Sequence, residues 1–243
     1  MTYFEGFIVP VPEANREAFA GHANQLAPLL REAGVVRQVE SWGSDVPDGK
    51  ITDFRKAVAA QPDEKAVFAW FEYPDRKARD AANARMMEDS RMMDMSSDVP
   101  FDAKRMIFGG FQSIVEEGAP GGAYMDGFVV PVPEDKREAY RELASGMAKV
   151  FREHGATRVV EAFGDDVTRG EVTDFYRAVD AKDGESVVFS FIEWPDKQSR
   201  DAAWDKIMKD ESMRPQGEMP FDGKRMFWGG FEPLVDTLEK ADA

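Results

Sequence analysis

The chain carries the same segment twice. FDAKRMIFGGF begins at Phe101, and FDGKRMFWGGF begins at Phe221. The opening segments match as well, since YFEGFIVPVP begins at Tyr3 and YMDGFVVPVP begins at Tyr124. Matches that recur at a nearly constant offset along a whole chain indicate an internal repeat. The 243 residues are therefore predicted to contain one structural unit twice, so the fold has to divide into two similar halves.

The boundary between the two copies is predicted in the segment EEGAPGG, residues 116–122, which is rich in small, flexible residues. We expect the first repeat over residues 1–117, a linker over 118–122 and the second repeat over 123–239. A chain of this kind is a pseudo-dimer in itself, and we expect it to be a monomer or a weak homodimer.

Each copy is predicted to have the element order β-α-β-β-α-β. In the first copy, a β-rich run over residues 3–11 precedes a helix whose apolar residues recur at three- and four-residue spacing. Gly34 follows this helix as a C-cap. Residues 35–42 and 66–73 are predicted strands, and residues 51–58, between them, a shorter extended piece.

The remaining helix and strand of each copy complete the unit. Asp75 and Asp196 lie where the N-cap of an alanine- and methionine-rich helix belongs, and the segments that begin at Phe101 and Phe221 are the predicted last strands. This order is that of the ferredoxin-like unit, an α+β fold whose helices cover one face of an antiparallel sheet. Two tandem copies can cover each other's free faces, sheet facing sheet.

Composition and the lack of certain segments exclude several kinds of partner, site and location. The net charge of −15 repels phosphate backbones and no basic run offsets it, so we expect no nucleic-acid partner. The absence of cysteine removes disulfides, thiolate catalysis and zinc–thiolate sites. The N-terminus lacks the pattern of a secretion signal, and no apolar run approaches the ~18 residues that span a bilayer. We therefore expect a cytoplasmic protein with no membrane partner.

The repeated motifs resemble the YbaA-like family, also called domain of unknown function 1428. The motifs that carry the resemblance are YxDGFVVPVP, VExxGDDV, GEVTDF, VVFSxIEWPD, RDAA and MPFDGKRM…GGFE. Members of this family are single units, and the resemblance implies that two fused ferredoxin-like (βαββαβ) units form an intrachain dimeric α/β barrel. The wider superfamily includes cofactor-free monooxygenases, lactone isomerases, stress-response proteins and haem enzymes, so the resemblance fixes no activity.

Four glutamates are candidate catalytic residues because each is retained in both copies within an otherwise apolar strand. They are Glu40, Glu161, Glu72 and Glu193. The strands that carry Glu40 and Glu72 are neighbours in the usual ferredoxin-like order, so these two carboxyls are expected to share one area of the sheet.

Arg105 and Arg225, on the predicted last strands, are candidate substrate-binding residues. We hypothesise that the glutamates and an arginine line a small polar pocket inside the barrel. There a glutamate with a raised pKa would act as a general base, and the arginine would hold an anionic substrate. The alternative is a cross-strand ion pair that fixes the strand register or the interface between the halves.

Glycines and tryptophans add two further expectations. Gly109 and Gly110 lie within a predicted strand, where they indicate either a bulge or close helix, or room for a ligand. Trp70 and Trp204 are candidate substrate-binding aromatic residues. Trp204 aligns with Asn83, which indicates that one half has begun to specialise.

We expect no metal and no other cofactor. Asp53 and Asp174 follow tight turns, and aspartate bonding to its own backbone explains them without a cation. His22 and His154 have no counterpart in the other copy, which disfavours a paired histidine or haem site. His22 has an apolar helical register and is predicted to be a partly buried packing residue.

Two classes of function remain open from the sequence. The first is a protein that binds a small, partly apolar molecule between the two sheets, as a metal-free monooxygenase or isomerase-like enzyme. The second is a non-catalytic binding or stress-response module whose barrel is filled with side chains. A cavity of ligand size would favour the first class, and a packed interior the second.

Overall fold

The computed structural model describes residues 1–96, 98–211 and 217–238, so the end of the predicted second repeat at residue 239 lies outside the described residues. The strands of the first half are β1 (Tyr3–Pro12), β2 (Arg37–Asp45), β3 (Glu64–Tyr73) and β4 (Ile107–Gly118). Those of the second half are β5 (Tyr124–Pro133), β6 (Arg158–Asp166), β7 (Glu185–Trp194) and β8 (Phe227–Asp236).

The helices follow the same repeat. The first half contains α1 (Arg16–Ala33), α2 (Phe54–Ala57), α3 (Arg76–Glu88) and α4 (Ser90–Ser96). The second half contains α5 (Arg137–Glu153), α6 (Phe175–Ala178) and α7 (Lys197–Lys209). Single 3₁₀ turns, η1 (Glu13–Asn15) and η2 (Glu134–Lys136), precede α1 and α5.

The strands form one closed barrel in the order β1-β3-β2-β8-β5-β7-β6-β4. The last strand of each half pairs with the first strand of its own half and with the second strand of the other half. Thus β4 pairs with β1 and β6, while β8 pairs with β5 and β2, and every pair is antiparallel. The predicted intrachain dimeric α/β barrel is confirmed, and the two halves are parts of one hydrogen-bonded sheet.

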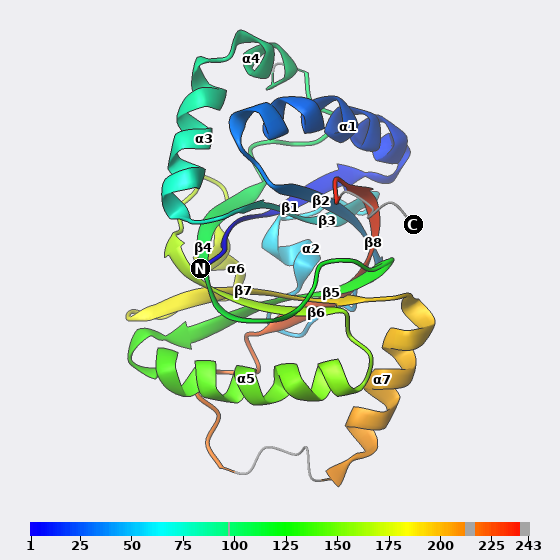
Figure 1. The fold of residues 1–243 in the computed structure, drawn as a ribbon, viewed down its shortest axis with the longest axis vertical. Helices are drawn as coiled ribbons and strands as arrows, with labels where there is room; N and C mark the ends of the chain where they lie inside the picture. The colour runs from blue at the N-terminus through cyan, green and yellow to red at the C-terminus, as the bar shows by residue number, and fades with distance from the viewer. Residues whose placement is uncertain (97, 212–216, 239–243) are drawn as a thin grey trace.

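The longer helices cover the outside of the barrel (Figure 1). Helices α1 and α3 lie over the strands of the first half, with the short α4 packed beside them, and α5 and α7 lie over the strands of the second half. The short α2 and α6 lie between the two sets of strands instead. The prediction of an extended piece at residues 51–58 is wrong, because the Asp53 side chain accepts the Lys56 amide hydrogen and starts the helical turn α2. The predicted N-caps Asp75 and Asp196 and the left-handed Gly34 are confirmed.

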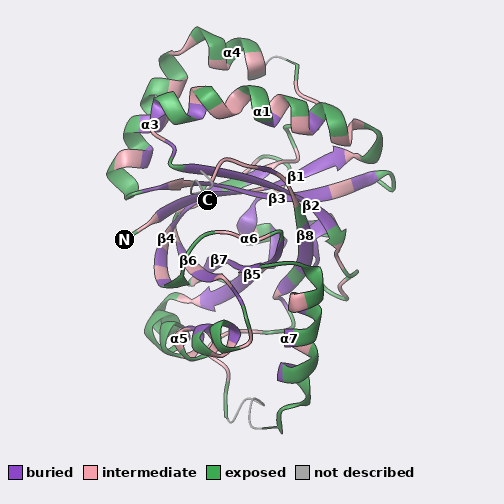
Figure 2. Cartoon of the chain, turned by 45° about the vertical axis from the view of Figure 1, so that its right-hand side comes forward, coloured by how far each residue is buried: buried purple, intermediate pink, exposed green. Residues whose placement is uncertain are grey.

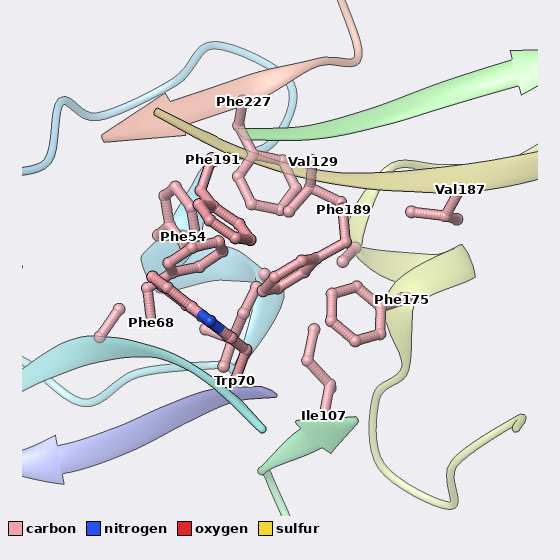
Figure 3. Packing of buried hydrophobic residues seen from close by; sticks show 14 of the residues in the cluster. Phe54, Phe68, Trp70, Ile107, Val129, Phe175, Val187, Phe189, Phe191 and Phe227 are labelled. Carbon is pink, nitrogen blue, oxygen red and sulfur yellow. The ribbon is translucent and has the colours of Figure 1, made fainter. Parts of the chain in front are cut away.

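The barrel interior is filled with apolar side chains from both halves (Figure 3). The strands of the barrel are accordingly largely buried (Figure 2). Phe68 stacks on Phe189 with ring centroids 4.5 Å apart, and Trp70 stacks on Phe191 at 4.0 Å. Helices α2 and α6 add Phe54 and Phe175 to the same cluster. An eight-stranded barrel is just wide enough for side chains to fill it. The expected ligand site between the two sheets is therefore wrong.

The double glycines give room to neighbouring side chains. A Cβ atom on Gly110 would overlap the hydroxyl of Tyr3, and one on Gly230 would overlap that of Tyr124. The β4–β6 register also shifts between Gly110 and Phe111. The structural interpretation of these glycines, a bulge with a close neighbour, accounts for them, although the neighbour is a tyrosine of the adjacent strand.

Trp70 tests how far stability depends on the packed interior. Its side chain is fully buried, so Trp70→Ala is expected to lower the free energy of unfolding by about 3–5 kcal/mol. Trp70→Phe is the matched control, because Phe191 holds the equivalent position and the Trp70 Nε1 has no hydrogen-bond partner. We expect it to cost less than about 1.5 kcal/mol. Urea unfolding measures both, and equal losses would contradict the packing described.

Candidate functional site

Two equivalent cavities lie on the outer faces of the sheet, under the helices. The second-half pocket has a volume of about 260 Å³ and the first-half pocket about 230 Å³. The second-half pocket is lined by Phe128, Val130, Tyr140, Leu143, Ala144, Met147, Phe151, Glu161, Ser190, Ile192, Met219, Phe221 and Met226. The first-half pocket is lined by Phe7, Val9, Phe19, His22, Ala23, Leu26, Glu40, Phe71, Met92, Met95, Val99, Phe101 and Met106.

Each pocket contains one carboxyl group in an otherwise largely apolar wall. In the second-half pocket this group is Glu161 of β6, to which the Tyr140 hydroxyl of α5 donates a hydrogen bond at 2.7 Å. Ser190, its cross-strand neighbour on β7, also lines the pocket. Burial raises the pKa of Glu161 to about 7, although both hydroxyls favour the ionised form. The group therefore titrates near neutral pH.

Glu40 of β2 is the equivalent group in the first-half pocket, and its side chain is 6% exposed. Burial raises the pKa of Glu40 to about 7 as well. Its hydrogen-bond donor differs, because the Gln38 Nε2 donates to the Glu40 Oε1 at 3.2 Å. Phe19 and Ala69 stand where the second half has Tyr140 and Ser190, so neither hydroxyl is present.

Glu72 and Glu193 lie on the opposite face of the sheet from Glu40 and Glu161. Successive residues of a strand alternate between faces, and Glu72 follows the inward-facing Trp70 by two positions. Val39, the neighbour of Glu40, belongs to the interior cluster, so Glu40 faces the helices. The prediction that Glu40 and Glu72 share one area is wrong, although their strands are neighbours as expected.

Both inner glutamates bind arginines of the other half. Arg37 reaches both oxygens of Glu193 at 2.8 and 2.9 Å, and Arg158 reaches both oxygens of Glu72 at 3.0 and 2.8 Å. Each arginine is at most 2% exposed. Glu193 is also 3.6 Å from Arg158, which links the two pairs. This is the arrangement of an ion pair at the interface between the halves.

Arg105 and Arg225 do not join either pocket. The last strands begin at Ile107 and Phe227, so both arginines lie in the preceding turns, and their predicted position on a strand is wrong. Arg105 forms a bidentate bond to Glu64 at 2.7 Å, and Arg225 bonds to both oxygens of Glu185 in the same way.

The two predicted tryptophans lie apart from each other. Trp70 belongs to the barrel interior. Trp204 lies on α7, where its Nε1 donates to Asp126 at 2.8 Å and its ring contacts Phe151 of the second-half pocket edge to face. In the first half the aligned Asn83 donates to Glu5 instead. The difference at this position is thus an exchange of one hydrogen-bonded structural pair for another.

No group of three or more histidine, aspartate or glutamate residues in the described part of the chain could hold a metal ion. Asp53 and Asp174 cap α2 and α6 and accept the Gly49 and Gly170 amide hydrogens, as the turn interpretation predicted. His22 is partly buried, as predicted, and lines the first-half pocket. Among the described helices, none is long and apolar enough to cross a membrane.

Sequence reasoning missed the partners that distinguish the two pockets. Tyr140, Ser190 and Gln38 contact the pocket carboxyls but are not shared by the two copies, so the repeat gave no signal for them. Arg37 and Arg158 were missed for another reason. Both copies retain an arginine at the start of the second strand, and that pattern was a usable signal for the inner ion pairs.

The closed eight-stranded barrel made from two βαββαβ halves defines a fused dimeric α/β-barrel protein. The model of the family described as "Protein of unknown function (DUF1428)" matches residues 2–103 and again residues 123–223, and the chain belongs to this family. It is 53% identical over 117 residues to the Uncharacterized protein YbaA of Escherichia coli (strain K12), which is 48% of this chain and 100% of that relative. The YbaA protein of Shigella flexneri gives the same figures.

Solved structures share the fold at low sequence identity. An anthrone oxidase-like protein matches with a TM-score of 0.55 and 12% identity, over 97% of this chain and 92% of that chain. A candidate monooxygenase from Lactobacillus acidophilus matches with a TM-score of 0.56 and 7% identity, over 97% and 95%. Identities this low show the fold alone.

Glu193 is expected to stabilise the interface between the halves. Glu193→Gln removes a charge from a fully buried group and leaves Arg37 with Asp236 as its remaining acidic partner. We expect the free energy of unfolding to fall by about 3 kcal/mol, because a buried cation loses part of its compensation. Asp205→Asn, in an exposed pair with Lys209, is the control and should cost no more than about 1 kcal/mol. Similar losses in both variants would contradict a stabilising role.

Glu161 makes stability depend on pH in a defined direction. Its pKa is raised from 4.5 to about 7 in the folded chain, so the folded state holds a proton that the unfolded state releases. Stability therefore falls as pH rises from about 4.5 to 7 and is constant above that range. Glu161→Gln removes this loss, and its stability relative to the wild type should rise by about 2 kcal/mol between pH 5 and pH 8. Thermal unfolding measures the change. The exposed Glu142→Gln is the control, and a parallel pH profile for Glu161→Gln and wild type would contradict the prediction.

Proposed function

We propose that the second-half pocket binds a small, mainly apolar molecule and that Glu161 removes a proton from it as a general base. The first-half pocket, of similar size, binds a second small molecule. Sites for drug-sized ligands have volumes of roughly 300–1,000 Å³, so ligands of both pockets are smaller than these. The activity is that of a small-molecule enzyme without a metal.

One observation carries this proposal. Glu161 has a pKa of about 7 inside an apolar cavity, and no lysine or arginine is among the described residues that line the cavity. A general base works best when its pKa lies near the working pH. Glu72 and Glu193 are instead held by buried arginines in ion pairs, whereas Glu161 has no such partner among the residues that line its pocket.

The Tyr140 and Ser190 hydroxyls lie beside the proposed base. A base has to be held in one orientation, and the hydrogen bond from the Tyr140 hydroxyl holds the Glu161 carboxyl in the pocket. Burial raises the pKa of Tyr140 well above 10, so its hydroxyl remains a neutral donor. Tyr140 is thus a positioning residue, and Glu161 is the group that meets the substrate.

The same proton transfer serves two reactions. When Glu161 removes a proton from a carbon beside a carbonyl and returns it to another carbon, the substrate isomerises and needs no co-reactant. When the resulting carbanion adds dioxygen, it forms a carbon–oxygen bond and, after taking up a proton, a hydroperoxide. Cleavage of the O–O bond with loss of water then leaves a new carbonyl group, so one oxygen atom enters the product and the other leaves as water. Chains of the same fold are described as an anthrone oxidase-like protein and a candidate monooxygenase, which makes dioxygen the co-substrate to test first.

A second candidate function is a non-catalytic binding module. The packed barrel interior favours it, because that space holds no ligand. In this case the two outer pockets would bind small molecules without changing them.

Deuterium exchange tests proton removal directly. The protein is incubated in D₂O with 2-tetralone, a two-ring ketone with acidic carbon–hydrogen bonds, and exchange is followed by proton NMR. Wild type is expected to accelerate exchange above buffer, and Glu161→Gln to lower the enzymatic rate by about 10²-fold or more. Tyr140→Phe should keep part of the activity with a shifted pH profile, since it alters only the orientation and pKa of the base.

Glu40→Gln is the matched control, because the equivalent carboxyl is lost from the other half. Its exchange rate should equal that of wild type. Exchange that is unaffected by Glu161→Gln would overturn the assignment of the base. Binding of 2-tetralone without any acceleration of exchange would favour the non-catalytic module.

A further inference from the structure

We propose that the first-half pocket binds a small lipophilic organic ammonium ion whose positive charge pairs with Glu40. The pocket belongs to the other half of the chain from Glu161, and its ligand is of a different chemical class from the substrate proposed for Glu161. This inference follows from three features of the pocket and one of its surroundings. The pocket has a carboxyl with free acceptor sites, aromatic and thioether walls, and no lysine or arginine among its described lining residues, and a buried amide oxygen without a partner lies on the neighbouring Gln38.

The Glu40 carboxyl has hydrogen-bonding capacity to spare. Among the described residues its hydrogen-bond donor is the Gln38 Nε2, at the long distance of 3.2 Å, and this donor is shared with the Ala23 carbonyl at 3.3 Å. An ionised carboxylate offers about four acceptor sites. In the second half, two hydroxyl groups act on Glu161, whereas the aligned Phe19 and Ala69 of the first half provide no hydroxyl to Glu40.

Gln38 adds a second acceptor that lacks a donor. Its side chain is 1% exposed, and its Oε1 is buried without a hydrogen-bond partner. The Nε2 of the same amide contacts Glu40 and the Ala23 carbonyl, and both residues line the pocket. Buried polar groups are nearly always paired, so Glu40, the acceptor of this cluster that lines the pocket, calls for a further donor. A primary ammonium group carries three N–H donors and meets this requirement.

The walls of the pocket suit an organic cation. Four of the lining residues are phenylalanines and three are methionines: Phe7, Phe19, Phe71, Phe101, Met92, Met95 and Met106. Aromatic faces attract ammonium ions, and methionine adapts to ligand shape. The volume of about 230 Å³ limits the occupant to a small amine.

Among the described residues that line the first-half pocket, none carries a fixed positive charge. The titratable neighbour of Glu40 among these residues is His22 of α1, and burial lowers the pKa of His22, which keeps the imidazole neutral at pH 7. The lining residues from β1, β3, α4 and the segment before β4 are apolar. The countercharge for an ionised Glu40 therefore comes from the ligand, and the net charge of −15 attracts cations to the chain.

Binding of 2-phenylethylamine, compared with its neutral isostere 2-phenylethanol, tests the proposal. Titration calorimetry of the full chain at pH 8 is expected to show at least tenfold tighter binding of the amine. The affinity for the amine should rise between pH 6 and pH 8 as Glu40 ionises, while that for the alcohol should not.

Variants locate the site. Glu40→Gln should reduce affinity for the amine at least tenfold and leave the alcohol unaffected, whereas Glu161→Gln should leave amine binding intact. Phe19→Tyr, which introduces the hydroxyl found in the second half, should also weaken binding of the amine. This second variant keeps the test valid if Glu40→Gln fails to fold. Equal affinity for amine and alcohol, or amine binding that survives Glu40→Gln, would overturn the proposal. Glu161→Gln is expected to abolish the deuterium exchange while amine binding persists, so the two proposals fail separately.

Discussion

The structure depends on hydrogen bonding between strands of different halves. β4 pairs with β6 and β8 pairs with β2, so neither half completes its sheet alone. Closing the ring turns the inner faces of both sheets toward each other, and eight strands leave a space that Phe68, Trp70, Phe189 and Phe191 fill by stacking. Room for small molecules is consequently found on the outer faces, beneath the helices.

The inner ion pairs strengthen the same closure. Arg37 and Arg158 each bind a glutamate from the other half, and all four side chains are largely shielded from water. Removing one partner of such a pair leaves a buried charge uncompensated. Because each pair joins residues of different halves, this cost holds the two halves together. Fusion of the copies keeps both partners of each pair in one chain, so the two halves are free to diverge elsewhere.

The two halves differ in the residues that surround the pocket carboxyls. Glu40 and Glu161 have the same buried position and similarly raised pKa values, yet their donors differ. Hydroxyls orient Glu161, whereas an amide with an unpaired oxygen accompanies Glu40. The two cavities are therefore similar in size, but the hydrogen-bond donors around their carboxyl groups differ. This difference is the physical basis for assigning different ligands to the two pockets.

The sequence alone determined the repeat, the order of the long elements, the family resemblance and the glutamates worth attention. These features depend on local periodicity and on residues retained in both copies. Only the tertiary structure decided which face of the sheet each glutamate occupies, because alternation along a strand separates Val39 from Glu40 without showing which of them is inside. The same holds for Arg37, whose partner Glu193 lies 156 residues away, and for the helical turn at Phe54, where one capping bond overrides a β-like pattern.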